Sequence, residues 1–357
     1  MPTLRDRRPS AVCLLVATLA FSSSAPAQWI AQRSPTDAEL RGLSVLSPSA
    51  VWASGARGTV VHTTDGVTWV QDTVRGAESL DFRAIAATSA RVAHVLSIGD
   101  SSRIYRTTDG GRTWSLTFTN TRVGAFFDAI QFWDAQHGIA MSDPVDGRFL
   151  VITTEDGGET WRELPAERLP RSLPGEAAFA ASGTCLMVRG KSDAWLVSGG
   201  GATARVHHTP DRGRSWTVVD TPIRAGAGSA GIFSIAFADA RNGVIAGGDY
   251  QQPTQRGRNL AVTRDGGRTW TLGDSASSPA GYRSAVAYLP RDRRRLVAVG
   301  LSGTDISQDG GRSWEQTDST PYNSVALARA GRSTVWWAVG PKGRIGRWAG
   351  ERMPGDR

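Results

Sequence analysis

Short runs in which apolar or small residues alternate with polar ones recur along the chain, as in 82–86 (FRAIA) and 92–96 (VAHVL). Alternation with a period of two over four to eight residues is typical of β-strands, and the runs are bounded by turn residues. No run of helical length shows an apolar face with a period of 3.6. The pattern therefore predicts an all-β protein.

One octapeptide punctuates these runs, with the form [ST]-x-D-x-G-x-[ST]-W. It occurs at 107–114 (TTDGGRTW) and in near-copies at 154–161, 209–216, 263–270 and 307–314, with a shortened copy at 63–69. The aspartate is expected to accept backbone N–H groups of a tight turn, and the second glycine to supply a positive φ. The tryptophan then begins the returning strand and buries its ring. These structural positions are Asp65, Trp69, Asp109, Trp114, Asp156, Trp161, Asp211, Trp216, Asp265, Trp270, Asp309 and Trp314.

The spacing of the motif predicts a β-propeller. Successive motif aspartates are 44, 47, 55, 54 and 44 residues apart, which is the length that four short strands and their turns need. Segment 322–348 supplies three more strands without a motif, and 29–33 looks like an outer strand without a blade. We expect the two segments to pair, which would close a ring of seven four-stranded blades and remove the exposed edge of the last sheet.

Propeller geometry separates two faces. The motif turns join the third and fourth strands of each blade on one face, while the connections between blades and between the second and third strands share the other. The extra length of the chain falls in connections of the second kind, at 164–176, 221–231 and 251–258. Loops of extra length gathered on one face favour that face for binding.

The motif resembles the Asp-box, or BNR repeat, of sialidase-like propellers. Six copies and the layout of the whole chain are similar to the photosystem II assembly factor (Ycf48-like) group and its bacterial secreted relatives. This resemblance implies a non-catalytic propeller that acts in the assembly or stability of a membrane complex, with a partner that depends on the organism.

The N-terminus has the pattern of a cleaved signal peptide. Arginines at 5, 7 and 8 precede an apolar segment at 11–21 and the sequence Ala-Pro-Ala at 25–27. We expect residues 1–27 to be removed, 28–350 to form one propeller domain and 351–357 to be a short tail. The protein would then be periplasmic or extracellular. The apolar segment is too short to span a membrane, so no membrane insertion is expected.

Charge, cysteine content and histidine positions indicate no nucleic-acid, disulfide or metal site. The net charge is +8 and only two of the 41 basic residues are lysines, but no basic run interleaved with aromatics indicates a nucleic-acid partner. Cys185 is left without a disulfide partner after cleavage. His207 and His208 are adjacent on a strand, so their rings face opposite sides and cannot share a metal ion. We expect no metal, no cofactor and a monomer.

The first residues of each innermost strand converge at the channel mouth on the loop-rich face. Aligning the units makes Arg41, Arg83, Asp128, Phe233, Arg283 and Asn323 equivalent, while the fourth unit registers poorly. Arginines with a few carboxylates and aromatic edges suit an acidic peptide, a carboxylated sugar or an organic acid, although the charges could instead pair with one another. The candidate face comprises Arg41, Arg83, Asp100, Asp128, Asp143, Asp146, Arg148, Glu176, Asp249, Tyr250, Arg283 and Asn323.

Three functions stay open at this point. The first is an exported scaffold that binds a protein or an acidic ligand and has no catalytic residues. The second is a glycoside hydrolase, because the resemblance to sialidases implies an arginine triad, a tyrosine nucleophile and two acids. The chain offers residues of these types at Arg41, Arg83, Arg283, Tyr250 or Tyr282, Glu176 and Asp128. The Arg-Ile-Pro segment of that family is absent. The third is an oxidoreductase resembling quinone-dependent propellers, which would have eight blades and vicinal cysteines.

Overall fold

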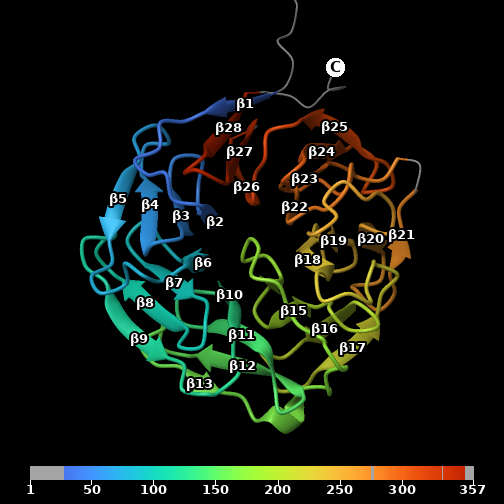
Figure 1. The fold of residues 1–357 in the computed structure, drawn as a ribbon. Coiled ribbons are helices and arrows are strands. Elements are labelled where there is room, and N and C mark those ends of the chain that lie inside the picture. Colours follow the sequence, from blue (N-terminus) through green and yellow to red (C-terminus); the bar gives the residue numbers. More distant parts are fainter. Residues whose placement is uncertain (1–27, 275–276, 332, 350–357) are drawn as a thin grey trace, which may run out of the picture.

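The computed structural model describes residues 28–274, 277–331 and 333–349, which form a ring of seven four-stranded antiparallel sheets (Figure 1). Apart from strands, the described residues contain one short 3₁₀ helix, η1 (Ala166–Arg168). The predicted all-β, seven-bladed propeller is confirmed. The predicted leader at 1–27 and tail at 351–357 lie outside the described residues. Within the described part, no helix has the length and apolar character needed to cross a membrane.

In blades 1 to 6 the strands follow chain order from the centre of the ring outward. Blade 1 has β2 (Leu40–Val45), β3 (Val51–Gly55), β4 (Thr59–Thr63) and β5 (Val70–Thr73). Blade 2 has β6 (Phe82–Ala87), β7 (Ala93–Ser97), β8 (Arg103–Thr107) and β9 (Ser115–Thr119). Blade 3 has β10 (Phe127–Phe132), β11 (Gly138–Val145), β12 (Arg148–Thr154) and β13 (Arg162–Glu163).

The second half of the ring repeats this order. Blade 4 has β14 (Leu186–Arg189), β15 (Asp193–Val197), β16 (Arg205–Thr209) and β17 (Thr217–Asp220). Blade 5 has β18 (Ala230–Phe237), β19 (Gly243–Asp249), β20 (Leu260–Thr263) and β21 (Thr271–Leu272). Blade 6 has β22 (Ala285–Tyr288), β23 (Leu296–Gly300), β24 (Gly303–Ser307) and β25 (Glu315–Asp318). Blade 7 has β26 (Ser324–Ala330), β27 (Ser333–Val339), β28 (Ile345–Ala349) and β1 (Gln28–Ala31).

Blade 7 joins the two ends of the described chain, as predicted. Strand β1 pairs antiparallel with β28, with Trp29 opposite Trp348, and Figure 1 shows the two strands side by side. The Trp29 ring packs against Tyr322, Trp336 and Trp348, and its indole N–H donates to Thr304 Oγ1 of blade 6 at 2.8 Å. The first strand thus closes the ring and also ties blade 7 to its neighbour.

The hydrophobic core lies between neighbouring blades. In the second strand of several blades every residue is buried, as in β3, β7 and β23, because that strand has a partner on each edge and a blade against each face. The outermost strands β5 and β9 are mostly exposed. This gradient explains why inner strands read as nearly continuous apolar or small residues.

The repeated motif forms a hydrogen-bonded turn. In blade 2, Thr107 Oγ1 donates to Asp109 Oδ1 at 2.9 Å and accepts the Gly111 N–H at 3.0 Å. The Asp109 carboxylate also accepts the Thr113 N–H at 3.0 Å and the Thr113 hydroxyl at 2.6 Å. The same four bonds recur in the turns at Asp156, Asp211, Asp265 and Asp309.

The second glycine of each full motif has two functions. It adopts positive φ, as at Gly158 (φ 81°), and it packs against the preceding blade. A Cβ at Gly158 would lie 2.5 Å from Nε2 of His94 in blade 2. The indole N–H of the motif tryptophan donates to a carbonyl only at Trp270 and Trp314 among the described residues, so this bond is not part of the shared turn.

Truncating the closing tryptophan should destabilise the whole ring. For Trp29→Ala we expect the free energy of unfolding to fall by about 3–5 kcal/mol, because a buried aromatic ring and its hydrogen bond are lost. Urea denaturation of the mature protein measures this. Ile30→Ala on the same strand is the matched control, since Ile30 is 51% exposed; equal effects of the two changes would contradict ring closure by Trp29.

Acid should weaken the motif turns. Hydrogen bonds from the Thr113 hydroxyl and N–H lower the pKa of Asp109 from 3.8 to about 2. A carboxylate whose pKa is lower in the folded state stabilises the fold above its unfolded pKa, and this contribution disappears as the pH falls from about 4 to about 2. Denaturation midpoints measured over that range should therefore decline less steeply for Asp109→Asn than for the unchanged protein. An unaltered slope in the variant would rule out this role.

Candidate functional site

Irregularities in four innermost strands direct side chains toward the channel mouth. The pairing of β2, β6, β10 and β18 each skips one residue, respectively Arg41, Arg83, Asp128 and Phe233. A β-bulge of this kind leaves one residue unpaired and turns its side chain out of the regular alternation. Four of the six residues that the sequence alignment made equivalent thus occupy equivalent bulge positions.

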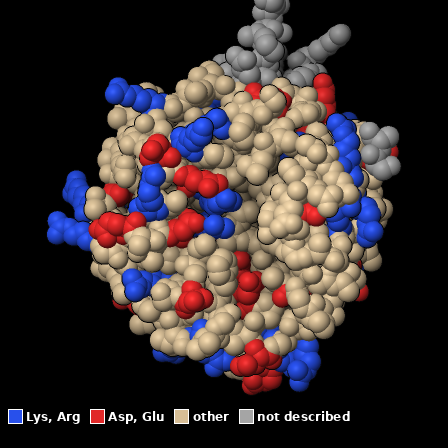
Figure 2. All heavy atoms as spheres, viewed as in Figure 1, with Lys and Arg blue, Asp and Glu red and all other residues tan. Residues whose placement is uncertain are grey.

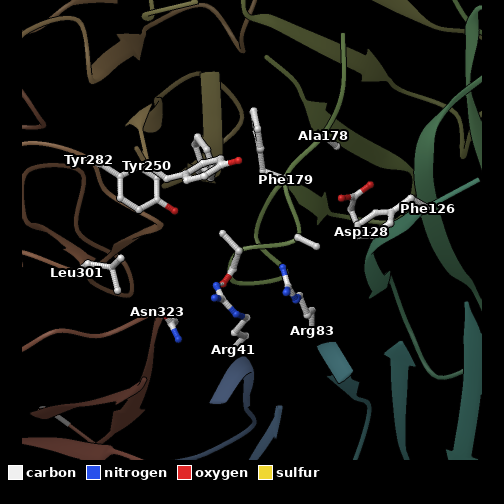
Figure 3. A pocket seen from close by; sticks show the side chains of 13 residues that line it. Arg41, Arg83, Phe126, Asp128, Ala178, Phe179, Tyr250, Tyr282, Leu301 and Asn323 are labelled. Carbon is white, nitrogen blue, oxygen red and sulfur yellow. Dashed lines mark hydrogen bonds between the residues drawn. The ribbon is translucent and has the colours of Figure 1, made fainter. Parts of the chain in front are cut away.

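These bulges border a half-open cavity of about 370 Å³ in the centre of the ring (Figure 3). Its walls differ in chemistry. Arg41 and Arg83 lie together on one side, Tyr250 and Tyr282 on another, and Asp128 on a third. The lining comprises Arg41, Arg83, Phe126, Asp128, Ala178, Phe179, Ala180, Ala181, Phe233, Tyr250, Tyr282, Leu301 and Asn323.

The floor of the cavity is a segment of the chain itself, residues 178–184, which we call the plug. In Figure 1 it is the yellow-green loop that enters the centre of the ring. The Ser182 hydroxyl donates to the Ser284 carbonyl at 2.8 Å, and Thr184 Oγ1 donates to Ser234 Oγ at 2.8 Å. The Ser182 carbonyl accepts the Ser324 hydroxyl at 3.4 Å. The plug is therefore bound to blades 5, 6 and 7 across the channel.

The basic wall is already paired with acids. Arg41 lies 2.7 Å from Glu39 and donates to the plug at the Ala181 carbonyl, while Arg83 lies 2.8 Å from Asp81. Both guanidinium groups keep partial contact with solvent. Basic and acidic side chains lie next to one another over blades 1 and 2 in Figure 2. The net charge of this wall is therefore small despite its arginines.

The acidic wall has unmet hydrogen bonds. Asp128 is 1% exposed, and neither carboxyl oxygen has a hydrogen-bond partner among the described residues. Burial raises the pKa of Asp128 well above its ordinary value; Asp143 adds to this effect and Arg83 opposes it. Burial also raises the pKa of Asp143 to about 6, although its carboxylate accepts the N–H of Ala178 at the start of the plug at 2.7 Å.

Arg283 requires a correction to the alignment. Ala285 pairs with Val299 as Ala84 pairs with Leu96, so Ser284, not Arg283, corresponds to Arg83. The Arg283 guanidinium is fully buried against Asp305 and donates to Ser302 Oγ at 2.8 Å. It does not line the cavity.

Glu176 also lies away from the cavity, in a buried polar network of blade 4. Its carboxylate accepts Nε of Arg205 at 2.9 Å, the Ser198 hydroxyl at 2.6 Å and the Leu173 N–H at 2.7 Å. His207 Nε2 lies 3.2 Å from the same group. These contacts satisfy the carboxylate within the protein, so it is not available to a ligand.

The remaining candidates belong to the loop-rich face but do not line the cavity. Asp146 forms an ion pair with Arg122 at 3.3 Å, and Asp249 caps the Gln251 N–H at 2.9 Å. The Arg148 guanidinium donates to the Leu169 carbonyl. The carbonyl of Asp100 accepts the Asn120 amide at 2.9 Å. Five of the twelve candidates come together at the cavity: Arg41, Arg83, Asp128, Tyr250 and Asn323.

Sequence reasoning named Phe233 and Tyr282 but did not predict the path of the plug, which brings Phe179 into the same wall of the cavity. Phe179 stacks on Phe233 with ring centroids 4.0 Å apart, and Phe233 meets the Tyr282 ring edge at 4.7 Å. The available signal was the poor register of the fourth unit, where small residues precede β14.

Within the described part of the chain, no three potential metal ligands lie close enough together to hold an ion. The rings of His207 and His208 contact Glu176 and Asp193 respectively.

The ring and its repeated turns define an Asp-box β-propeller. The BNR/Asp-box repeat family matches residues 105–116. A solved structure described as YCF48 bound to D1 peptide is 17% identical, with a TM-score of 0.61 over 94% of this chain and 100% of that one. YCF48 from Cyanidioschyzon merolae is 19% identical, with a TM-score of 0.63 over 92% of this chain and 100% of that one.

An enzyme shares the same ring. The GH74 xyloglucanase from Xanthomonas campestris is 16% identical, with a TM-score of 0.59 over 88% of this chain, which spans 52% of the enzyme. No curated protein matches the chain by sequence. Seven blades also differ from the eight that resemblance to quinone-dependent propellers would imply.

Breaking the buried ion pair of Glu176 should cost more stability than breaking an ion pair of a cavity arginine. Arg205→Leu leaves the Glu176 carboxylate buried without its main counter-ion, so we expect the free energy of unfolding to fall by about 3–5 kcal/mol. Arg83→Gln breaks a partly exposed pair and should cost no more than about 1 kcal/mol. Urea denaturation of both variants compares them, and a larger loss for Arg83→Gln would contradict this division.

Proposed function

We propose that this protein is an exported, non-catalytic recognition scaffold that binds a segment of another protein at the cavity on its loop-rich face. The observation that carries this proposal is the half-open cavity with apolar side chains at its rim, where Tyr250 and Leu301 are each 45% exposed. Exposed apolar groups beside a concave polar site are typical of surfaces that bind other molecules.

The comparisons support a protein partner at the level of the fold. One similar propeller was solved with a peptide bound, and this chain covers the whole of that structure. The long connections of blades 3 to 5 also meet on one face: the Arg224 N–H donates to the Arg258 carbonyl at 2.9 Å, and Gly147 accepts from Ser172 at 2.9 Å. Contacts between connections give a partner a preformed surface, which lowers the entropy cost of binding.

The location and assembly state form part of the same proposal. The leader-like sequence at 1–27 supports export to the periplasm or beyond, and the closed ring, in which every blade has four paired strands and only short outer edges, supports a monomer. N-terminal sequencing of the protein recovered outside the cytoplasm should begin at Gln28. Light scattering should give the mass of one chain.

A glycoside hydrolase is the second candidate, favoured by Asp128 at the cavity with the nearby carboxyl of Asp143 behind it and by the similarity to the GH74 enzyme. The sialidase-like set is not assembled, because Arg283 and Glu176 are buried elsewhere. Fluorogenic sialosides and β-glucans test the candidate. Turnover by the mature protein that disappears in Asp128→Asn would replace the scaffold proposal.

Partner capture tests the scaffold directly. The tagged mature protein, used to pull down proteins from its own exporting cell, should recover a partner. A Tyr250→Ala/Leu301→Asp double variant should recover it at least tenfold less, because a few aromatic and apolar anchors that become buried in the complex contribute most of the binding free energy. Leu116→Asp is the matched control, since Leu116 is 51% exposed on the outer strand β9. Recovery of the same proteins by both variants would refute the assignment of this face.

A further inference from the structure

The cavity contains a charge-bearing group that the protein itself does not satisfy. Asp128 lines the cavity near Phe179 (Figure 3), but its carboxyl oxygens are covered from solvent. Both of its oxygens are buried and without a hydrogen-bond partner among the described residues. Because buried polar atoms in folded proteins are almost always hydrogen-bonded, an unpartnered carboxyl beside a cavity indicates a partner that the ligand supplies.

The two arginines of the basic wall, in contrast, already have hydrogen-bond partners. Arg41 and Arg83 each have an acid within 2.8 Å, and both side chains remain more than one-fifth exposed, so water completes their hydrogen bonds. An anion entering the cavity would compete with Glu39 and Asp81 for these guanidinium groups. The sequence-based expectation of an acidic ligand therefore receives no support from the contacts of the two arginines.

The wall beside Asp128 suits a cation. Phe179 lies between Asp128 and the two tyrosines in Figure 3, and its ring stacks on Phe233. Tyr282 packs edge-on against the same Phe233 ring. Aromatic faces attract ammonium groups, and the attraction is stronger where water is excluded. A carboxyl flanked by such rings can bind both the charge and the apolar body of an amine.

We propose that the cavity binds a primary ammonium group carried on an apolar chain or ring, with the Asp128 carboxylate as its counter-ion. The ammonium group comes either from a lysine side chain of the partner or from a free organic amine. The lysine source rests on the proposed function, whereas the free amine does not. The Asp128 oxygens are covered from solvent in the structure, so binding requires a rotation of this side chain toward the cavity.

Binding of such a cation is coupled to a proton. The raised pKa of Asp128 favours the neutral carboxyl in the free protein, and an ammonium ion favours the carboxylate. The titratable and charged groups that act on Asp128 are Asp143 of β11, Arg83 of β6 and the buried thiol of Cys185. Binding should therefore release a proton, and affinity should rise with pH as the carboxyl ionises.

Calorimetry on the mature protein tests the proposal with four probes. Phenethylamine and Nα-acetyl-lysine amide carry the ammonium group, Nα-acetyl-norleucine amide is the uncharged counterpart, and 3-phenylpropionate is the anion. We expect saturable binding of the two amines only, and proton release measured in buffers of different ionisation enthalpy. Asp128→Asn should weaken amine binding at least about tenfold, because it removes a buried counter-ion.

Arg83→Gln is the control that separates the two charge preferences. Removing a cation near Asp128 should leave amine binding equal or stronger, whereas a site for anions would lose affinity. Circular dichroism and thermal unfolding of Asp128→Asn check that the variant is folded. If it is, weaker amine binding reports the loss of the carboxylate and not the loss of the fold. Binding of 3-phenylpropionate without the amines, or amine affinity unchanged in Asp128→Asn, would overturn the inference.

Competition identifies the source of the ammonium group. If phenethylamine displaces the captured partner, the partner supplies a lysine. If the amines bind but no partner is captured, the ligand is a free amine and the proposed scaffold function fails alone. If a partner depends on Tyr250 and Leu301 but neither amine binds, the scaffold stands and the ammonium site is wrong.

Discussion

The ring depends on the way one carboxylate holds each motif turn. Asp109 and its counterparts accept a backbone N–H and a hydroxyl from the same residue four positions later, which fixes the hairpin without help from other elements. The fixed hairpin leaves a glycine facing the preceding blade, where a side chain would collide with residues such as His94. Local turn geometry and contact between blades are therefore set by the same eight residues, and repetition of the turn produces the ring.

Two buried carboxyl groups differ in whether the protein itself supplies their hydrogen-bond donors. Glu176 is surrounded by donors from Arg205, Ser198 and the backbone, so its charge is used entirely within blade 4. Asp128 is also buried but has no donor among the described residues, and it borders the cavity. Residue type does not distinguish the two; the supply of donors around each one does. A carboxyl that the scaffold leaves unsatisfied is available to a ligand.

Features that arise from local repetition were predictable from the sequence. Motif spacing predicts the blades, and the motif-free end together with Trp29 predicts ring closure, because each depends on residues near in sequence or on a repeated pattern. The position of Arg283 was wrong by one residue, since the bulge that displaces Arg83 has no mark in the sequence and is absent from the described pairing of β22 and β23. The burial of Glu176 depends on Arg205, 29 residues away, and the path of the plug depends on contacts with three distant blades.

The plug determines the route by which anything can reach the centre of the molecule. Because the plug crosses the channel, with Ser182 anchored on blades 6 and 7 and Thr184 on blade 5, a polypeptide cannot be threaded through this ring from one side to the other. Whatever touches Asp128 must enter and withdraw through a single mouth. Only a chain terminus, a protruding side chain or a sharp bend can enter a cavity that is closed at one end. The middle of an extended strand can lie across the opening but cannot reach the bottom.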